Sequence, residues 1–434
     1  TSITAFVGRA ARGPVDDPVT VTSFAGFVRT FGGLWPESAL GPAVQDYFRQ
    51  GATVAVVVRA HTARAADTAV LTFPDSGQTP LVLQAASPGT WGARLVAGCD
   101  GEERLVVADT ATGQTESFAD LSGVDTGSAL VRVQSRPERL ATGLAATLQP
   151  PTNDGDPPDV DAYRRAFDAL GRTELVNLLV VPGDPEPEVV ADAMALAAAR
   201  RAVLLRDPPV GWATVSAAVS GAASPAFLRS PNTAVYFPNL RRPGPLRGPA
   251  GAVAGVIVRS DLTRGVWRSP AGLEANLDGV EELEVGVNDV DGGRLNPLGV
   301  NCIRTFPGAG PVVWGARTTD GGEWKYLTVR RTALFVEESL DRGTRWARFE
   351  PNEEPLWARI RADAGAFMDH LFRRGAFAGT TGRDAWFVRC DGETTTQDDV
   401  HRGVVNIVVG FAPTRPAEFV VLHVQQVAGD PRNW

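Results

Sequence analysis

The fold class is best predicted from residues 174–206, which read ELVNLLVVPGDPEPEVVADAMALAAARRAVLLR. The first part of this stretch, 174–181, is almost continuously apolar, which is typical of a strand buried on both faces. An Ala-rich helix is predicted over 187–200 and a second apolar strand over 202–206. We expect the two strands of such a βαβ unit to be parallel and joined by a right-handed crossover. This part of the chain is therefore predicted to be α/β.

Residues 1–62 are predicted to form another compact α/β unit. Its expected elements are, in chain order, a strand over 3–8, a helix over 24–31, a helix over 42–50 and a strand over 52–59. Ser23 has the side chain to cap the first helix, and Gly32 can end it in a left-handed conformation. The run ATVAVVVR at 52–59 is apolar almost throughout, which indicates a further strand buried on both faces.

Residues 63–149 change character, because short strand-like pieces alternate there with turns rich in Gly and Asp. This pattern predicts a small β-domain inserted after the first unit. The stretch PPTNDGDPP at 150–158 is predicted to be a linker. Beyond the βαβ unit, we expect a strand over 234–237 and a helix over 249–263 that packs closely through its Gly and Ala positions.

The last third of the chain is predicted to contain two helices and three strands. A strand over 325–329 should lead into a helix near 331–341, and Asn352 is expected to cap a long helix that ends near Arg374. Apolar residues recur at i+3 and i+4 along the long helix, so one of its faces should be buried. Strands are expected at 385–389, 404–409 and 418–424.

The fold class that follows is a mixed α/β (α+β) chain of several domains. A length of 434 residues agrees with about two to three domains. We expect a core domain from both chain ends, residues 1–62 and 290–434, an inserted β-rich domain at 63–149 and an α/β domain at 150–289.

The charge and the apolar pattern exclude several classes of protein. Lys and Arg number 42 against 50 Asp and Glu, which gives a net charge of −8 and argues against a protein that coats nucleic acid. The sequence has no apolar run of the length that a membrane-spanning helix needs, and its start lacks the basic region of a secretory signal. Three distant cysteines predict neither a disulfide framework nor a zinc site, so a reducing cytoplasm is the expected compartment.

Motifs that carry chemistry are missing from the sequence. It contains no GxGxxG, GxxxxGKS/T, GxSxG or HExxH. The turn PGDPEP at 182–187 is acidic and rich in proline, and would repel a phosphate rather than bind one. The acidic stretch after Asn288 resembles the start of a calcium loop, but Val300 stands where the bidentate Glu is needed, so a turn is the better interpretation. We therefore predict no catalytic site, no cofactor and no metal, and a structural or assembly protein rather than an enzyme.

Several stretches, in the same order along the chain, resemble the sheath proteins of contractile phage tails and related contractile injection systems. They are TAFVGR from Thr4, the block 43–59, SPGTWG from Ser87, GVWRSPA from Gly265, LNPLGVNCIR from Leu295, VWGART from Val313, FEPN from Phe349 and APTRPAEFV from Ala412. Each motif alone is weak evidence for this family. The whole set, in this order and at both ends of the chain, is specific for it.

The resemblance implies a structural sheath subunit that polymerises helically, as stacked rings around an inner tube. Contraction of such a sheath drives the tube through a target envelope, with the energy stored in subunit packing. The implied partners are further copies of the chain, the inner tube protein, and baseplate and terminal cap proteins, with no nucleic acid and no insertion into a membrane. Assembly is expected in the cytoplasm of a bacterium, for a phage tail or a free particle. An extended arm is also expected ahead of the block that here begins at Thr1.

The resemblance also suggests residues that bind other subunits. An arm strand that adds to a neighbour's sheet is expected at Glu418, Phe419, Val420, Val421, Leu422, His423 and Val424. The alternative is that this strand lies inside its own core. Tube-facing candidates are Arg330, Arg331, Arg359, Arg361, Arg373 and Arg374. The alternative for these arginines is that they cover the solvated faces of two amphipathic helices.

Two other functions are kept as hypotheses. One is an enzyme with a degenerate nucleotide-binding βαβ unit, for which a shift in melting temperature with nucleotides would be the sign. The other is a receptor-binding or adhesin-like module, which would form trimers rather than helical assemblies.

Overall fold

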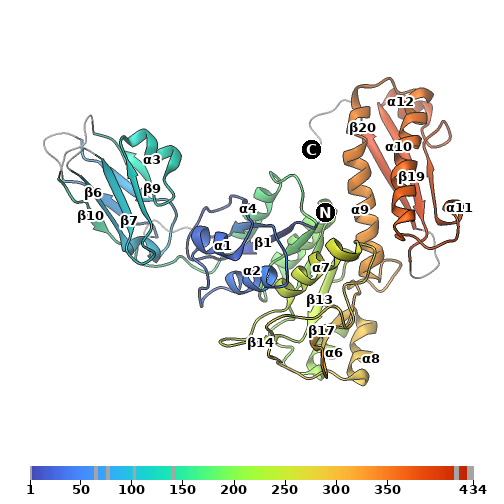
Figure 1. Ribbon diagram of the computed structural model, residues 1–434, viewed down its shortest axis with the longest axis horizontal. Coiled ribbons are helices and arrows are strands. Elements are labelled where there is room, and N and C mark those ends of the chain that lie inside the picture. Colours follow the sequence, from blue (N-terminus) through green and yellow to red (C-terminus); the bar gives the residue numbers. More distant parts are fainter. Residues whose placement is uncertain are drawn as a thin grey trace.

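The chain folds into three parts that lie in a row. The computed structural model describes residues 2–62, 67–74, 79–100, 104–137 and 143–414, and the backbone of 420–427. Figure 1 shows an α/β body in the middle, with an inserted β-domain at one end and a C-terminal domain at the other. The body combines the start of the chain with the residues between the inserted domain and about 326.

An eight-stranded sheet runs through the body, in the order β17-β16-β13-β12-β11-β1-β3-β2. The strands are β1 (Thr4–Gly8), β2 (Val19–Val21), β3 (Ala55–Arg59), β11 (Leu178–Val180), β12 (Val203–Arg206), β13 (Thr233–Phe237), β16 (Val300–Phe306) and β17 (Gly310–Val313). The six inner strands are parallel, and β2 and β17 are antiparallel to their neighbours at the two edges. The predicted βαβ unit is confirmed, because β11 and β12 pair in parallel after the helix α5 (Pro187–Ala199).

Helices cover both faces of this sheet, and the alternation of side chains along each strand supplies both cores. Phe6 of β1 packs with α1 (Phe24–Phe31), α2 (Leu40–Arg49) and α7 (Ala250–Arg264), whereas its neighbours Ala5 and Val7 pack with α4 (Val160–Leu170) and α5. The helices α6 (Val215–Ala223) and α8 (Asp289–Leu295) complete the body near β16.

The helices α2 and α7 pack at unusually short range, as the Gly and Ala pattern of α7 predicted. A Cβ added at Gly251 would lie 2.4 Å from the carbonyl oxygen of Ala43, and one at Gly255 would lie 2.5 Å from that of Tyr47. The two glycines therefore let the backbones approach. The predicted caps of α1 are also confirmed: the Ser23 side chain accepts a hydrogen bond from the Gly26 N–H, and Gly32 ends the helix with φ 91°.

The inserted domain has its own core and two small sheets. One sheet contains β10 (Thr147–Gln149), β4 (Val70–Thr72), β5 (Val82–Ala85) and β9 (Val131–Ser135), and the other contains β6 (Leu95–Cys99), β7 (Leu105–Asp109) and β8 (Thr115–Phe118). Leu71, Leu83 and Val107 lie in its hydrophobic cluster, which the short helix α3 (Leu121–Gly127) also contacts.

Buried polar groups fix the inserted domain to the body. Arg12 of the body donates a hydrogen bond to the carboxylate of Asp109 at 3.2 Å, and Asp109 is completely buried. Arg59, at the end of β3, is also completely buried and donates to the carbonyl oxygens of Gly13 and Pro88 at 3.0 Å each. These contacts satisfy charges that would otherwise be costly to bury, so they define one orientation of the inserted domain.

The C-terminal domain comprises α9 (Leu327–Gly343), the 3-10 turn η3 (Arg345–Phe349), α10 (Glu354–Arg373) and a three-stranded sheet with the short helices α11 (Gly382–Ala385) and α12 (Gln397–His401). Two expectations were wrong here. Residues 325–329 do not form a strand, because α9 already begins at Leu327. Asn352 does not cap α10, since its side chain bonds the backbone oxygen of Val404 and the indole N–H of Trp357, and Glu353 is the N-cap.

The large sheet combines segments that the sequence suggested were separate. Strand β1 lies between β3 and β11, so residues 1–62 and the 150–289 segment share one sheet rather than forming two domains. The strands β16 and β17 from the 290–434 segment complete that sheet. The physical reason is that buried parallel strands need neighbours on both sides. The apolar pattern of a strand shows that it is buried, but it does not show which other strands lie beside it.

Candidate functional site

The C-terminal sheet is the first part of the candidate site. It contains β18 (Trp386–Arg389), β19 (Val404–Phe411) and β20 (Val420–Val427), with β19 in the middle. The strands β19 and β20 are antiparallel along their whole length, from Val404 opposite Val427 to Phe411 opposite Val420. Alternate residues of β19, from Val405 to Phe411, are buried in one cluster with residues of α9 and α10.

Strand β20 forms an edge of this sheet in the described part of the chain. It pairs with β19 on one side only, along eight residues, whereas β18 at the other edge has four. A long edge presents a row of unpaired N–H and C=O groups, to which a strand from another chain can add. Such an edge therefore suits assembly.

The predicted arm residues fall on this edge. Val420–Val424 lie in β20, where they pair with β19 of the same chain. Glu418 and Phe419 lie outside the described residues. The pairing seen here matches the alternative of an ordinary strand in its own domain, and donation of the strand to a neighbour stays a prediction.

Arg331 cannot face a tube, and the structure corrects this prediction. Its guanidinium makes two hydrogen bonds to the carboxylate of Asp261 in α7, and only 4% of its side chain is exposed. Arg331 appeared to belong to a solvated helix face because its partner lies 70 residues earlier in the chain.

Arg330 is also turned towards the chain itself. Its Nε donates to Asn232 Oδ1 at 2.9 Å, and its guanidinium lies 4.7 Å from the ring centre of Trp324. Burial lowers the pKa of Arg330, and Glu337 opposes that shift. Arg330 thus connects α9 to the body.

The other four candidates lie in α10 or, for Arg374, at its C-cap, and each contacts another side chain of the same chain. Arg359 lies over the Trp346 ring at 4.0 Å, and Arg374 over the Trp267 ring at 5.2 Å. Arg361 pairs with Glu354 at 2.6 Å, and Arg373 pairs with Asp369 at 2.5 Å. Arg359, Arg373 and Arg374 are exposed, so they remain available to a partner.

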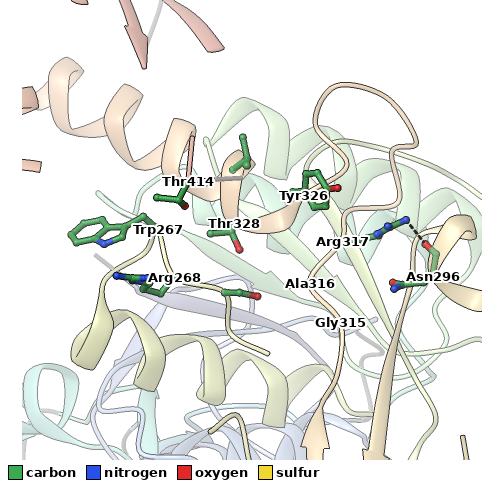
Figure 2. A pocket seen from close by; sticks show the side chains of 11 residues that line it. Trp267, Arg268, Asn296, Gly315, Ala316, Arg317, Tyr326, Thr328 and Thr414 are labelled. Carbon is green, nitrogen blue, oxygen red and sulfur yellow. Dashed lines mark hydrogen bonds between the residues drawn. The ribbon is translucent and has the colours of Figure 1, made fainter. Parts of the chain in front are cut away.

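A cleft between the body and the C-terminal domain is the second part of the site. It has a volume of about 590 Å³. Figure 2 shows Trp267 and Arg268 on one side, Arg317 and Asn296 on the other, and Tyr326 and Thr328 of the α9 region between them. The Arg317 guanidinium donates to the Asn296 carbonyl oxygen at 3.1 Å and lies 5.9 Å from the Tyr326 ring centre.

This cleft was not predicted from the sequence. Its two arginines come from GVWRSPA and VWGART, two of the motifs that carry the resemblance, and the fold brings them together across a distance of 49 positions from Arg268 to Arg317. Both motifs were recognised in the sequence, but only the fold shows that their arginines line the same cleft.

A buried carboxylate of the chain lies between the turn that follows β11 and the start of α7. Asp207, just after β12, accepts hydrogen bonds from the N–H of Gly183 at 2.8 Å and of Ala250, the first residue of α7, at 2.7 Å. Burial raises the pKa of Asp207 to about 6. A Cβ at Gly248 would lie 2.0 Å from the Asp207 carboxyl carbon. The N-terminus of α7 thus already holds a carboxylate from its own chain.

Groups that could act as nucleophiles or hold a metal are few. Burial raises the pKa of Cys302 to about 11 and that of Cys390 to about 12, which disfavours the reactive thiolate. The described residues contain no cluster of His, Cys, Asp and Glu suited to a metal ion. Among the helices described, none is both long and apolar enough to cross a membrane.

Comparison with known sequences identifies the C-terminal part. Residues 319–426, which contain the C-terminal domain almost completely, match the family described as the phage tail sheath C-terminal domain. The chain is also 22% identical over 184 residues to the tail sheath protein of Vibrio phage KVP40. That alignment covers 42% of this chain and 26% of the phage protein.

Solved structures are similar along nearly the whole chain. The sheath tail protein of Listeria innocua matches with a TM-score of 0.72 at 10% identity, covering 98% of this chain and 94% of that one. The sheath tail protein of Desulfitobacterium hafniense matches with a TM-score of 0.67 at 14% identity, covering 98% and 96%. The contracted helical sheath of the anti-feeding prophage matches with a TM-score of 0.63 at 24% identity, covering 97% and 92%.

The predicted resemblance and the mixed α/β, multi-domain fold class are confirmed by these comparisons. The chain has the fold of the sheath proteins of contractile phage tails and injection systems, and its residues 319–426 match the phage tail sheath C-terminal domain.

Proposed function

We propose that this chain is a contractile sheath subunit that polymerises helically around an inner tube and drives that tube through a target envelope when the sheath contracts. The observation that carries the proposal is the sheath fold along almost the whole chain, including its likeness to a contracted helical sheath. The energy of the stroke resides in the packing of the subunits, and the chain acts without catalysis or cofactor.

The C-terminal domain supports this proposal physically. The eight-residue edge strand β20 provides a backbone surface that a neighbour can extend. Each added backbone hydrogen bond contributes about 1 kcal/mol net. A few such bonds between each pair of subunits, repeated along a helix, keep a lattice connected while the bodies change their relative orientation.

The proposed partners are other copies of the chain, an inner tube, a baseplate and a terminal cap. A likeness to a protein in the baseplate structure of the anti-feeding prophage, at a TM-score of 0.64, supports the baseplate as one partner. Assembly takes place in the bacterial cytoplasm, without nucleic acid and without insertion into a membrane. Of the predicted tube-facing residues, Arg359, Arg373 and Arg374 remain the proposed ones, because they are exposed.

The first test is negative-stain electron microscopy of the purified chain, alone and with an inner tube protein from the same organism. Hollow, striated tubes of uniform width are the expected result. Compact monomers or closed trimers under all conditions, with the tube protein present, would contradict the proposal.

A second test probes the edge of the C-terminal sheet without altering the chain. A synthetic peptide with the sequence of residues 418–427 should compete for strand addition and raise the protein concentration at which tubes appear. A peptide of the same composition in scrambled order is the control. Equal effects of both peptides would show that strand addition does not hold the tubes together.

A further inference from the structure

One aromatic side chain stands out from the surface of the C-terminal domain. Phe349, the last residue of η3, is 94% exposed, more than any other large hydrophobic side chain in the part of the chain that the structure describes. The turn that carries it is well anchored, because Ala347 is buried and accepts a hydrogen bond from the Glu350 N–H at 3.2 Å. The phenyl ring is therefore presented to solvent from a fixed base.

Acidic residues follow Phe349 closely in the sequence. Glu350, Glu353 and Glu354 are exposed, and Glu354 pairs with Arg361. Aromatic side chains are enriched in the buried centres of protein interfaces, where a polar rim surrounds them. Phe349 with Glu350 and Glu353, which we call the Phe349 knob, has this composition.

The cleft between the body and the C-terminal domain has the complementary composition. Its walls include Trp267, Tyr326 and Val329, which are apolar, together with the cations Arg268 and Arg317. None of its lining residues in the described part of the chain is acidic. A volume of about 590 Å³ lies in the usual range for a pocket that encloses an organic group, so a phenyl ring can enter.

The knob and the cleft lie at opposite ends of the same helix. Tyr326, Thr328 and Val329 form the wall of the cleft at the start of α9, and Phe349 follows soon after α9 ends at Gly343. At 1.5 Å per residue, the 17 residues of α9 separate them by about 25 Å. One chain cannot fill its own cleft with its own knob, whereas a second copy can.

We propose that the Phe349 knob of one copy inserts into the cleft of a second copy, with Glu350 and Glu353 near Arg268 and Arg317. Such a contact joins two different surfaces, so it repeats from copy to copy and builds an open helix unless a rotation closes it into a ring. The proposed contact is inferred from the knob and the cleft alone. Only the idea that this contact occurs within a helical sheath rests on the proposed function.

Substitutions on the two surfaces test the contact in the full-length chain. Phe349→Ala should raise the concentration at which assembly begins about tenfold, as expected for the loss of a central aromatic anchor. Val290→Ala, at another exposed position (73%), is the matched control and should leave assembly unchanged. Glu350→Arg and Arg268→Glu should each weaken assembly, and the two together should restore it. Normal assembly of Phe349→Ala, or a double variant as weak as the two losses combined, would overturn the proposal.

A cross-linking experiment separates this contact from the sheath function. A photoreactive benzoylphenylalanine at position 349, in an equal mixture of 14N- and 15N-labelled chains, should form links between chains that map to residues 267–268 or 326–329. Such links without any tubes would support the contact and count against the helical sheath. Tubes in which the links lie within one chain, map elsewhere or do not form would overturn the contact and leave the sheath function standing.

Discussion

Arg331 of α9 and Asp261 of α7 form an ion pair with two hydrogen bonds that is almost completely buried, at 4% and 2% exposure of the two side chains. The Ser2 hydroxyl donates to the same carboxylate. The pair joins the helix that begins the C-terminal domain to a helix in the centre of the body. Its geometry is the favourable kind for a buried pair, since the planar guanidinium matches both carboxylate oxygens.

Removing one member of this pair should destabilise the protein strongly. Asp261→Asn or Arg331→Met leaves the other group buried without its counter-charge, and we expect a loss of about 3–5 kcal/mol in the free energy of unfolding. Urea denaturation of each variant measures this loss. The double variant Asp261→Leu with Arg331→Met should lose less than either single variant, because no charge is then left unpaired. A double variant that loses the sum of both would contradict this account.

Replacement of glycine by alanine should have opposite effects inside and outside the contact between α2 and α7. Gly251→Ala should destabilise the protein by about 1–3 kcal/mol, because its Cβ would lie 2.4 Å from the Ala43 carbonyl oxygen. Gly293→Ala in α8, where a Cβ meets nothing within 4 Å, should stabilise by about 0.5–1 kcal/mol through helix propensity. Thermal denaturation of both variants makes the comparison, and a neutral Gly251→Ala would refute the close approach.

Asp207 should make stability depend on pH in the acid range. Burial raises its pKa in the folded state to about 6, above the value of about 4 in an unfolded chain, so the folded state holds a proton that the unfolded state has released. The wild type should therefore lose stability as the pH rises from about 4 to about 6. Relative to Asp207→Asn, this loss should reach up to roughly 3 kcal/mol. Chemical denaturation at several pH values tests it, and parallel pH profiles of the two proteins would disprove it.

The junction of the inserted domain depends on Asp109. Asp109→Asn removes the charge that faces the buried guanidinium of Arg12, and should loosen the two parts where they touch. Hydrogen exchange at the Gly13 amide reports on this junction, because that N–H donates to the Ser87 hydroxyl at 2.9 Å. We expect at least tenfold faster exchange there, for a free-energy loss of about 1.4 kcal/mol or more. Unchanged exchange at Gly13 would mean that other contacts hold the domain.

Local elements were predictable from the sequence where a single physical signal dominates. The apolar run at β3 and the caps of α1 at Ser23 and Gly32 needed only neighbouring residues, and the structure confirms them. The glycines of α7 also indicated a close helix contact before its partner α2 was known. Asn352 shows the limit of this approach, because a good capping residue was used instead to bond the distant residues Trp357 and Val404.

The candidate site was less predictable, because it is made of residues from distant segments. Arg268 and Arg317 both line the cleft, and nothing in the sequence near either residue indicates that the other lies close to it in space. Arg331 looked like a surface residue until its partner Asp261 was located. Exposure of Phe349 was equally hidden, since an aromatic residue before a helix usually suggests a core position.

The helix α9 belongs to two hydrophobic clusters at once. Leu327 and Leu334 pack into the main cluster of the body, and Val336 and Leu340 pack into that of the C-terminal domain. Neither cluster can melt without exposing part of the other, so body and C-terminal domain should behave as one calorimetric unit. Among the described residues, the hydrophobic cluster of the inserted domain has no member in common with these two clusters. We therefore expect the inserted domain to be a separate foldon, which can open while the rest of the chain stays native.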